Sequence, residues 1–447
     1  MLNIISTILF VVYLLKLLDF IYLFQIKEYR FDRFLSMFSD ESIFDIFYSR
    51  VPRFPAKSLR NILIIAFIIP LIFFNLSLIF SVNLTFLIIY FLLLPFFSLS
   101  TSILGVFLTG ILARIKRQQL IEQAREKVKE SSAVFVGITG SYGKSTTKEF
   151  LYQILSTKYR IAKTDANQNT DVGVAISILN NLKRDTEFFI VEMGAYKKGE
   201  IKTICDFVKP KYGIITALGN QHLELFGSKK NLIEAKSELL KCLPKNGKAY
   251  VNSDLKKYGV SSQAEISWFS TGKKTVGIPI TLPKDYLINI LPCTALALDL
   301  RIPMESITET IKNLAPLQAK LSIHSSINGA TVLNDSYNSS YEGFLLAIKT
   351  AVAKKVQKKI ILSRGLIELG DEKIKIYKNL ISELKKKNIY LYTTDRLFKK
   401  LSAKNNLVLY FRNEWIMFRK LRKITDKETL LIIEGKFPEK FIKNLIV

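Results

Sequence analysis

The sequence predicts an α/β protein that begins with transmembrane helices and continues into two domains, each built on a parallel sheet. Two observations lead to this fold class. Residues 61–113 contain no charged side chain, and from residue 132 onward short apolar strand-like runs alternate with helical ones. The expected parts are a membrane segment over 1–113 with a cytosolic amphipathic loop over 26–60, a helical linker over 114–131, and α/β domains over 132–318 and 319–447.

Three apolar segments are candidate membrane spans. A helical span needs about 20 apolar residues. The uncharged stretch 61–113 is therefore long enough for two spans, with a turn at residues 81–83. The run over 2–24 is the third candidate, although it carries Lys16 and Asp19. The sequence thus predicts a multi-pass protein of the cell membrane.

The positions of basic residues predict the topology. Basic side chains are concentrated between the first and second spans and directly after the third span, and they are Lys27, Arg30, Arg33, Arg50, Arg53, Lys57, Arg60, Arg114, Lys116 and Arg117. Positive charge near a span stays on the cytoplasmic side. We therefore expect an external N-terminus and cytoplasmic catalytic domains after residue 113.

Aromatic and aliphatic residues recur at helical spacing in the loop over 26–60. Phe31, Phe34, Leu35 and Phe38 are interleaved with charged residues. This pattern predicts amphipathic helices, which either lie on the inner leaflet or pack on a soluble domain.

The net charge of +27 allows three interpretations. They are nucleic-acid binding, attraction to anionic lipid, and a lysine-rich solvated surface. No basic motif with interleaved aromatic residues accompanies the lysine runs, so we expect no nucleic-acid partner. Cys205, Cys242 and Cys293 are isolated in the sequence without a CxxC pair, which predicts reduced cysteines in a cytosolic core.

Strands are expected wherever short apolar runs end in polar or turn residues. In the first α/β domain they are 134–139, 188–192, 212–217 and 249–252; in the second they are 331–334, 359–362, 389–392, 407–410 and 430–433. Helices are expected between them, and 287–314 is expected to be helical with Pro292 and Pro303.

The stretch Thr139-Gly-Ser-Tyr-Gly-Lys-Ser-Thr-Thr147 follows a predicted strand and opens a predicted helix. This is the context of a P-loop, in which glycines let backbone N–H groups face phosphates. Lys144 would reach the terminal phosphates and Ser145 would bind Mg²⁺. The general motif has glycine where Ile138 stands, so this loop is a variant.

Three further residues carry candidate chemistry. Glu192 ends an apolar strand, which is where the second Mg²⁺ anchor of a P-loop site usually stands. His222 is one of only two histidines in the chain. Lys236 lies in the middle of a predicted helix, where a lysine by itself is expected to be solvated.

Taken together, these stretches resemble the Mur ligase family in order and spacing. The similarity covers about two thirds of the chain, approximately residues 132–440, and is greatest to the branch that adds D-alanyl-D-alanine to a UDP-linked muramoyl tripeptide. The segments that carry it are TGSYGKSTT, VEMGAYKKGEI, QHLELFGS, EAKSEL and NDSYNSS.

The resemblance implies a fold, cofactors and roles for single residues. It implies a P-loop ATP-binding central domain, a Rossmann-like C-terminal domain and two Mg²⁺ ions. Lys144, Lys236 and His222 would be catalytic; Ser145 and Glu192 would hold one Mg²⁺, with His222 and a carbamylated Lys236 on the other; Asn167 and Asn169 would lie near the substrate. The residues that would contact ATP are Gly140, Ser141, Gly143, Lys144, Ser145, Thr146, Asn289, Asp335 and Asn338.

The implied reaction is ATP-dependent amide ligation. A carboxylate of a muramoyl-peptide precursor would be activated as an acyl phosphate, and an amino-acid or dipeptide amine would displace the phosphate. The family's N-terminal domain, which grips the UDP-sugar, is not recognisable, and the membrane segment stands in its place. A lipid-linked precursor or another peptide polymer therefore remains an alternative substrate.

Two other classes of function are weaker hypotheses. A P-loop transporter ATPase would carry an LSGGQ-type signature, which the sequence lacks. A non-catalytic scaffold would not need to keep Lys144, Glu192, His222 and Lys236.

Overall fold

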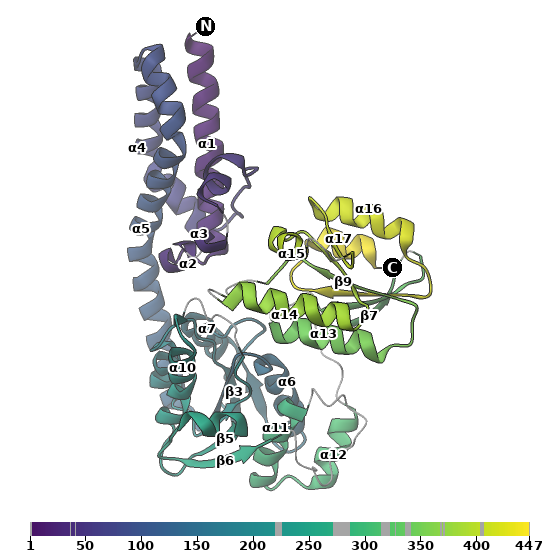
Figure 1. Cartoon of the computed structure of the whole chain (residues 1–447). Helices are drawn as coiled ribbons and strands as arrows, with labels where there is room; N and C mark the ends of the chain where they lie inside the picture. Colours follow the sequence, from purple (N-terminus) through teal and green to yellow (C-terminus); the bar gives the residue numbers. More distant parts are fainter. Residues whose placement is uncertain are drawn as a thin grey trace. The chain divides into compact units, whose positions relative to one another are not determined.

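The structure of this chain is a computed structural model (Figure 1). It describes residues 2–35, 37–40, 42–219, 226–270, 287–313, 322–326, 328–335, 341–366, 369, 372–402 and 406–446. The chain divides into two compact units, Met1–Glu122 and Gln123–Val447.

The first unit contains three helices long and apolar enough to cross a membrane: α1 (Leu2–Ile26), α4 (Leu59–Ser81) and α5 (Leu84–Glu130). The turn expected at residues 81–83 is confirmed, because α4 ends and α5 begins there. The helices are joined by polar contacts as well as apolar ones. The hydroxyl of Tyr13 donates to Oγ1 of Thr101 at 3.2 Å, and that of Tyr90 donates to Oδ1 of Asn75 at 2.9 Å.

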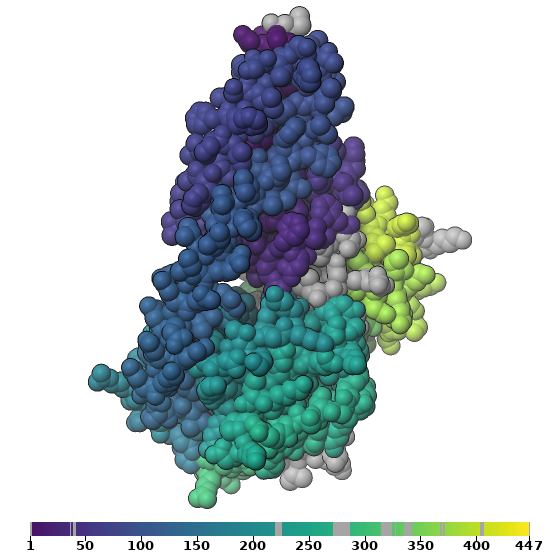
Figure 2. Space-filling view, turned by 90° about the vertical axis from the view of Figure 1, so that its left-hand side faces the viewer, coloured from purple at the N-terminus to yellow at the C-terminus, as the bar shows by residue number. Residues whose placement is uncertain are grey.

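The outer surface of these helices is apolar, as a lipid-facing surface would be. Blue atoms in Figure 2 belong to α4 and α5, whose exposed side chains include Phe73, Phe74, Phe91 and Phe107. The charged stretch expected as a separate linker over 114–131 is continuous with the third apolar helix, because nothing between Ala113 and Glu130 interrupts α5.

Lys16 and Asp19 are accommodated in α1 because they pair with each other and with the segment that follows. Nζ of Lys16 lies 3.8 Å from Oδ2 of Asp19, and Oδ1 of Asp19 accepts the backbone N–H of Arg53 at 3.0 Å. Arg50 Nε lies 3.6 Å from the same oxygen. A buried charge is tolerated only with such partners. These ions therefore fasten the loop onto α1.

The amphipathic loop folds into short helices that pack on α1 rather than forming long surface helices. They are α2 (Phe31–Leu35), α3 (Met37–Asp40) and the π-helix η1 (Asp45–Ser49). Phe34 and Phe47 are buried there, with the ring of Phe34 stacked on that of Phe24 at 4.3 Å, whereas Phe31 and Phe44 remain exposed. The apolar side chains of the loop that are buried thus pack mainly within this unit.

The second unit contains a six-stranded parallel sheet in the order β2-β3-β1-β4-β5-β6. Its strands are β1 (Val134–Thr139), β2 (Ile161–Lys163), β3 (Phe188–Glu192), β4 (Tyr212–Ile215), β5 (Lys248–Asn252) and β6 (Glu265–Phe269). The four expected strands are confirmed, with β4 ending at Ile215 rather than Ala217. The strands β2 and β6 were not predicted; both lie at edges of the sheet.

Helices cover both faces of this sheet, and η2 (Ser253–Tyr258) follows β5. One face packs on α6 (Lys144–Leu155), α11 (Leu287–Asp299) and α12 (Met304–Lys312). The other side carries α7 (Asp171–Asn181), α8 (Glu200–Val208) and α10 (Lys229–Cys242). The parallel α/β arrangement that the alternating pattern predicted is therefore confirmed.

A second sheet has the order β11-β10-β9-β12-β8-β7. Its strands are β7 (Ser322–Ser325), β8 (Thr331–Asp335), β9 (Lys358–Ser363), β10 (Tyr390–Thr393), β11 (Val408–Tyr410) and β12 (Thr429–Glu434). All neighbours are parallel except the edge strand β7, which was not predicted.

Two sets of helices pack on the two faces of this sheet. One set is α13 (Tyr341–Ala353), α14 (Lys373–Lys386) and α15 (Arg396–Leu401); the other is α16 (Glu414–Ile424) and α17 (Glu439–Leu445). Every expected strand of this domain is present, shifted by one residue at most ends.

Candidate active site

The loop over residues 140–143 joins the C-terminal end of β1 to the N-terminus of α6. Its two glycines adopt positive φ angles, +149° at Gly140 and +81° at Gly143. A Cβ added at Gly140 would lie 2.1 Å from Oγ1 of Thr216, so no larger residue fits there without displacement. The glycines therefore let the backbone turn tightly beneath the first N–H groups of α6, which form a positive end suited to anions.

Lys144 and Ser141 belong to this turn. Nζ of Lys144 donates to the carbonyl oxygens of Gly140 at 2.9 Å and Ser141 at 3.2 Å, so the amine lies over its own loop. The backbone N–H of Ser141 donates to the carbonyl of Ala217 at 2.7 Å. Its Oγ is buried and has no hydrogen-bond partner among the described residues. A buried hydroxyl of this kind is ready to bond an incoming oxygen.

Glu192 gathers polar side chains from two other segments at the end of β3. Its Oε1 accepts a hydrogen bond from Oγ of Ser145 at 3.0 Å and another from Nδ2 of Asn169 at 3.2 Å. Asn169 is itself held close to the strand end, because the N–H of Gly194 donates to its carbonyl at 2.7 Å. Three residues singled out in the sequence are thus brought to one point.

Lys148 is a member of this cluster that the sequence reading missed. Its Nζ lies 3.3 Å from Oε2 of Glu192 and donates to the carbonyl of Thr164 at 2.9 Å. Both side chains are almost fully buried. Its position in the sequence could have indicated this burial, because Lys148 is one turn after Lys144 and lies on the face of α6 that carries Leu151.

These neighbours decide the protonation of Glu192. Burial by itself would raise the pKa of Glu192, but the charges of Lys148 and Lys144, with the hydrogen bonds from Asn169 and Ser145, outweigh burial and lower the pKa. The carboxylate is therefore ionised at neutral pH, as a ligand for a divalent cation must be.

Lys236 is buried rather than solvated, which corrects the expectation for a lone lysine in the middle of a helix. Only 2% of the residue is exposed, and its Nζ donates to the carbonyl of Ala195 at 3.3 Å. Burial, and next the positive charge of Lys144, hold the pKa of Lys236 well below its ordinary value, although Glu200 and Glu238 oppose this. The neutral form of this amine is therefore more favoured than that of an exposed lysine.

Asn289, expected to contact the nucleotide, lies beside the glycine loop of residues 140–143. Its Oδ1 accepts a hydrogen bond from Oγ1 of Thr147 at 3.1 Å, and a Cβ at Gly143 would meet the same oxygen at 2.3 Å. Thr146 is buried in the first turn of α6. Asn167, expected near the substrate, has a left-handed backbone with φ of +64°.

Asp335 is an expected nucleotide contact that belongs to the second sheet. Asp335 ends β8, where its backbone pairs with Glu434 of β12. His222 and Asn338 lie outside the described residues. Within the described part of the chain, no three His, Cys, Asp or Glu side chains form a metal-binding group.

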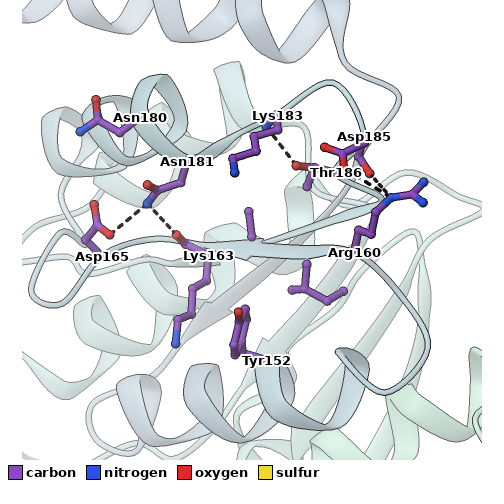
Figure 3. A pocket seen from close by; sticks show the side chains of 11 residues that line it. Tyr152, Arg160, Lys163, Asp165, Asn180, Asn181, Lys183, Asp185 and Thr186 are labelled. Carbon is purple, nitrogen blue, oxygen red and sulfur yellow. Dashed lines mark hydrogen bonds and ion pairs between the residues drawn. The ribbon is translucent and has the colours of Figure 1, made fainter.

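A pocket of about 440 Å³ opens near the edge strand β2, and none of the predicted site residues lines it (Figure 3). Several of its polar and charged side chains are paired with neighbours. Nε of Arg160 donates to the carbonyl of Asp185 at 2.7 Å, and Nδ2 of Asn181 donates to Oδ1 of Asp165 at 3.0 Å. Lys163 pairs with Glu149. The loop at the end of β1, rather than this pocket, is therefore the candidate active site.

The chain is similar to known proteins over the residues that contain this site. Residues 138–278 match the model of the Mur ligase middle domain. The chain is 28% identical over 277 residues to the UDP-N-acetylmuramoyl-tripeptide–D-alanyl-D-alanine ligase of Bacillus subtilis (strain 168), covering 56% of this chain and 60% of that protein. It is also 28% identical over 343 residues to the ligase of that name from Borreliella burgdorferi, covering 69% of this chain and 73% of the relative.

Solved structures share the fold. MurF from Acinetobacter baumannii superposes with a TM-score of 0.66 at 20% identity, over 74% of this chain and 80% of that one. The MurF ligase from Thermotoga maritima in complex with ADP has a TM-score of 0.63 at 22% identity, over 73% of this chain and 82% of that one.

Proposed function

We propose that this chain, which belongs to the Mur ligase family, is an ATP-dependent, ADP-forming ligase that joins D-alanyl-D-alanine to the tripeptide of a muramoyl-peptide precursor. The chain spans 60% of the length of its Bacillus subtilis relative, so the activity of that enzyme is proposed for this chain on the strength of the site. The observation that carries the proposal is the convergence of Ser145, Asn169 and Lys148 on the carboxylate of Glu192 beside a glycine loop.

The glycine loop is proposed to be the P-loop that binds the phosphates of ATP. Gly140 and Gly143 carry no side chain where Thr216 and Asn289 approach the loop, so the backbone can turn closely there. The buried Oγ of Ser141, which has no hydrogen-bond partner among the described residues, adds a donor. Lys144 lies over the loop, where it would move from backbone carbonyls to the transferred phosphoryl group. Thr146 and Asn289, together with Asp335 and Asn338 of the C-terminal domain, are proposed to complete the nucleotide contacts.

The residues present fit magnesium, which prefers oxygen ligands. The ionised carboxylate of Glu192 and the hydroxyl of Ser145 would hold one ion, and His222 with a carbamylated Lys236 would hold a second. Bound Mg²⁺ supplies positive charge that stabilises the transferring phosphoryl group. Carbamylation needs a neutral amine, which the lowered pKa of Lys236 favours.

In the proposed reaction a substrate carboxylate accepts the γ-phosphoryl group of ATP, and the incoming amine then displaces phosphate to form the amide. Asn169 links the substrate side of the site to Glu192, and Asn167 lies two residues before it. The C-terminal domain is proposed to be Rossmann-like and to close on the central domain, so that the acyl phosphate meets the amine rather than water.

The helices α1, α4 and α5 are proposed to anchor the enzyme in the cell membrane with both α/β domains in the cytoplasm. This orientation follows from the basic residues between α1 and α4 and after the apolar part of α5. The proposed membrane anchor favours a second candidate substrate, a lipid-linked muramoyl peptide, because an anchored enzyme and a lipid-linked substrate share one surface.

The experiment is an ATP turnover and ligation assay with the purified full-length chain. UDP-linked and lipid-linked muramoyl tripeptides are tested with and without D-alanyl-D-alanine. We expect ADP release to require both the tripeptide and the dipeptide, with ligated product in equal amount. The proposed ligase would be ruled out if the rate of ADP release were the same with and without the dipeptide, or if neither tripeptide supported turnover.

A further inference from the structure

The segment over residues 42–58, between α3 and α4, turns back along α1 instead of staying at its end. Nζ of Lys16 donates to the carbonyl of Ile46 at 2.9 Å, and the hydroxyl of Tyr48 donates to the carbonyl of Leu92 in α5 at 2.8 Å. Lys16 lies ten residues before the end of α1, which corresponds to about 15 Å along a helix. The hydrocarbon core of a bilayer is about 30 Å thick, so in the proposed orientation this contact lies well inside the membrane.

The chain then runs back along α1 to the start of α4 as a strap over residues 51–58 that has no helix or strand. Oδ1 of Asp19 accepts the N–H of Arg53 at 3.0 Å, and Oε1 of Gln25 accepts the N–H of Ala56 at 2.7 Å. Irregular backbone at membrane depth persists only where protein groups satisfy its polar atoms. The side chains of α1 therefore hold the strap by its backbone.

The strap and the first turn of α4 carry three basic side chains and no acidic one. They are Arg53, Lys57 and Arg60, and the chain contains no Asp or Glu between Asp45 and Glu122. Among the described residues, neither Lys57 nor Arg60 has an ion-pair partner. Cations at the cytoplasmic edge of a membrane attract anionic groups, and this edge of the protein supplies no carboxylate from the strap itself.

Tyrosine side chains position the two arginines. The guanidinium of Arg60 lies 4.0 Å from the ring centre of Tyr29, whose hydroxyl donates to Oδ1 of Asn61 at 2.9 Å. Nε of Arg60 is buried and has no hydrogen-bond partner among the described residues. The guanidinium of Arg53 donates to the hydroxyl of Tyr22 at 3.4 Å. A tyrosine ring fixes a guanidinium without neutralising it, so Arg60 keeps its positive charge for an anionic ligand.

Exposed apolar side chains flank these cations. Val51, Phe54 and Leu59 are 80%, 66% and 75% exposed, and Ile62, three residues after Leu59 on α4, is exposed as well. Apolar groups beside cations at the inner membrane interface fit a ligand that has an anionic head and hydrocarbon tails. A soluble phosphate would meet the cations but would leave the apolar side chains uncovered.

We propose that Arg53, Lys57 and Arg60, the strap site, bind the phosphate of an anionic phospholipid of the inner leaflet, with its acyl chains against Phe54 and Leu59. The three cations should together favour this lipid over a neutral phospholipid by about 10², since each basic side chain near an anionic headgroup contributes about fivefold. The site rests on the proposed membrane orientation and does not depend on the ligase reaction.

The experiment titrates the purified full-length chain in detergent with phosphatidylglycerol or with phosphatidylcholine of the same acyl chains. Native mass spectrometry counts the bound lipids. We expect the wild type to bind its first phosphatidylglycerol about 10²-fold more tightly than phosphatidylcholine. The combined variant Arg53→Gln, Lys57→Gln and Arg60→Gln should lose this preference. Lys57→Gln alone changes an exposed side chain and should lose about fivefold, which keeps the test valid if the combined variant does not fold.

The matched control is the combined variant Arg114→Gln, Lys116→Gln and Arg117→Gln, which removes the same charge from an exposed face of α5 and should keep the preference. Equal losses in the two combined variants would indicate diffuse attraction to a basic surface and would overturn the site. Equal binding of the two lipids by the wild type would overturn it as well. Glycerol 3-phosphate in excess should not displace the bound lipid, and displacement would show that the site binds a soluble phosphate instead.

Discussion

Oγ of Ser145 lies 3.0 Å from Oε1 of Glu192, across 47 residues of sequence. The contact exists because β1 and β3 are neighbouring parallel strands, which bring the start of α6 and the end of β3 to the same edge of the sheet. A hydroxyl and an ionised carboxylate at this edge, beside the N-terminus of a helix, form a natural place for a cation and a phosphate chain.

Lys144→Ala is expected to lower kcat by about 10² or more, the scale of losing an electrostatic contact made in the transition state. Lys144 is the lysine whose amine lies over the glycine loop of residues 140–143, the proposed P-loop. The measurement is steady-state ADP release by the purified variant. Lys245→Ala removes an exposed lysine as the matched control and should leave turnover unchanged. Near-normal turnover of the Lys144 variant would refute the P-loop assignment.

Lys236→Ala is expected to be inactive and to regain part of its turnover when short carboxylates are added. A small carboxylate can occupy the anionic position that a carbamate would fill beside the metal. Rescue is measured as turnover against carboxylate concentration, with Lys144→Ala as a comparison that the carboxylates should not restore. An unmodified Lys236 side chain in solvent, in the density of a nucleotide-bound structure, would contradict the carbamate.

Lys236→Met is expected to raise the midpoint of thermal unfolding at neutral pH in bicarbonate-free buffer, while turnover is lost. The folded-state pKa of Lys236 is lowered, so between that pKa and the unfolded value of about 10.4 the unfolded chain binds more protons. The wild type therefore gains stability as pH rises. The advantage of the variant should shrink towards high pH, and a variant less stable than wild type at pH 7 would contradict this account.

Lys148→Met is expected to lower the free energy of unfolding by about 3 kcal/mol, because removing one partner of a buried ion pair leaves the other charge uncompensated. The measurement is thermal unfolding of Lys148→Met, Glu192→Gln and the double variant in a double-mutant cycle. The double variant should lose less free energy of unfolding than the sum of the losses in the two single variants. Additive losses would show that the pair is not coupled.

The same pair predicts an acid dependence. The pKa of Glu192 is lowered in the folded state, so its stabilising contribution is complete above the unfolded value of about 4.3 and is lost as pH falls through the folded value.

Deletion of residues 1–113 is expected to reduce turnover of a lipid-linked muramoyl peptide presented in vesicles by about 10², since the enzyme and this substrate would no longer share a surface. The truncation keeps the last turns of α5, where Nζ of Lys127 donates to the carbonyl of Leu179 at 2.6 Å. The control is the UDP-linked tripeptide in solution. A fragment that turns over the lipid-linked peptide in vesicles as well as the full-length chain does would contradict this prediction.

Local features were predictable from the sequence because they depend on nearby residues. Apolar length predicted the three helices that are long enough to cross a membrane, and the alternation of strand and helix patterns predicted the two parallel sheets with their helices. The strands that were missed, β2, β6 and β7, all lie at sheet edges, where a strand is short or half-exposed and its apolar signal is weak. The loop with its glycines, Lys144 and Ser145 was also predictable, because its motif is formed by residues that are consecutive in the sequence.

Only the tertiary structure decided which distant side chains meet. No local pattern distinguishes Lys148, which pairs with Glu192, from the many other lysines of this chain, and none shows that Lys236 is buried. These contacts follow from the order of strands in a sheet and the register of helices upon it. Both are set by the packing of the whole domain, because the free energy of burying a charge depends on neighbours that the sequence places far away.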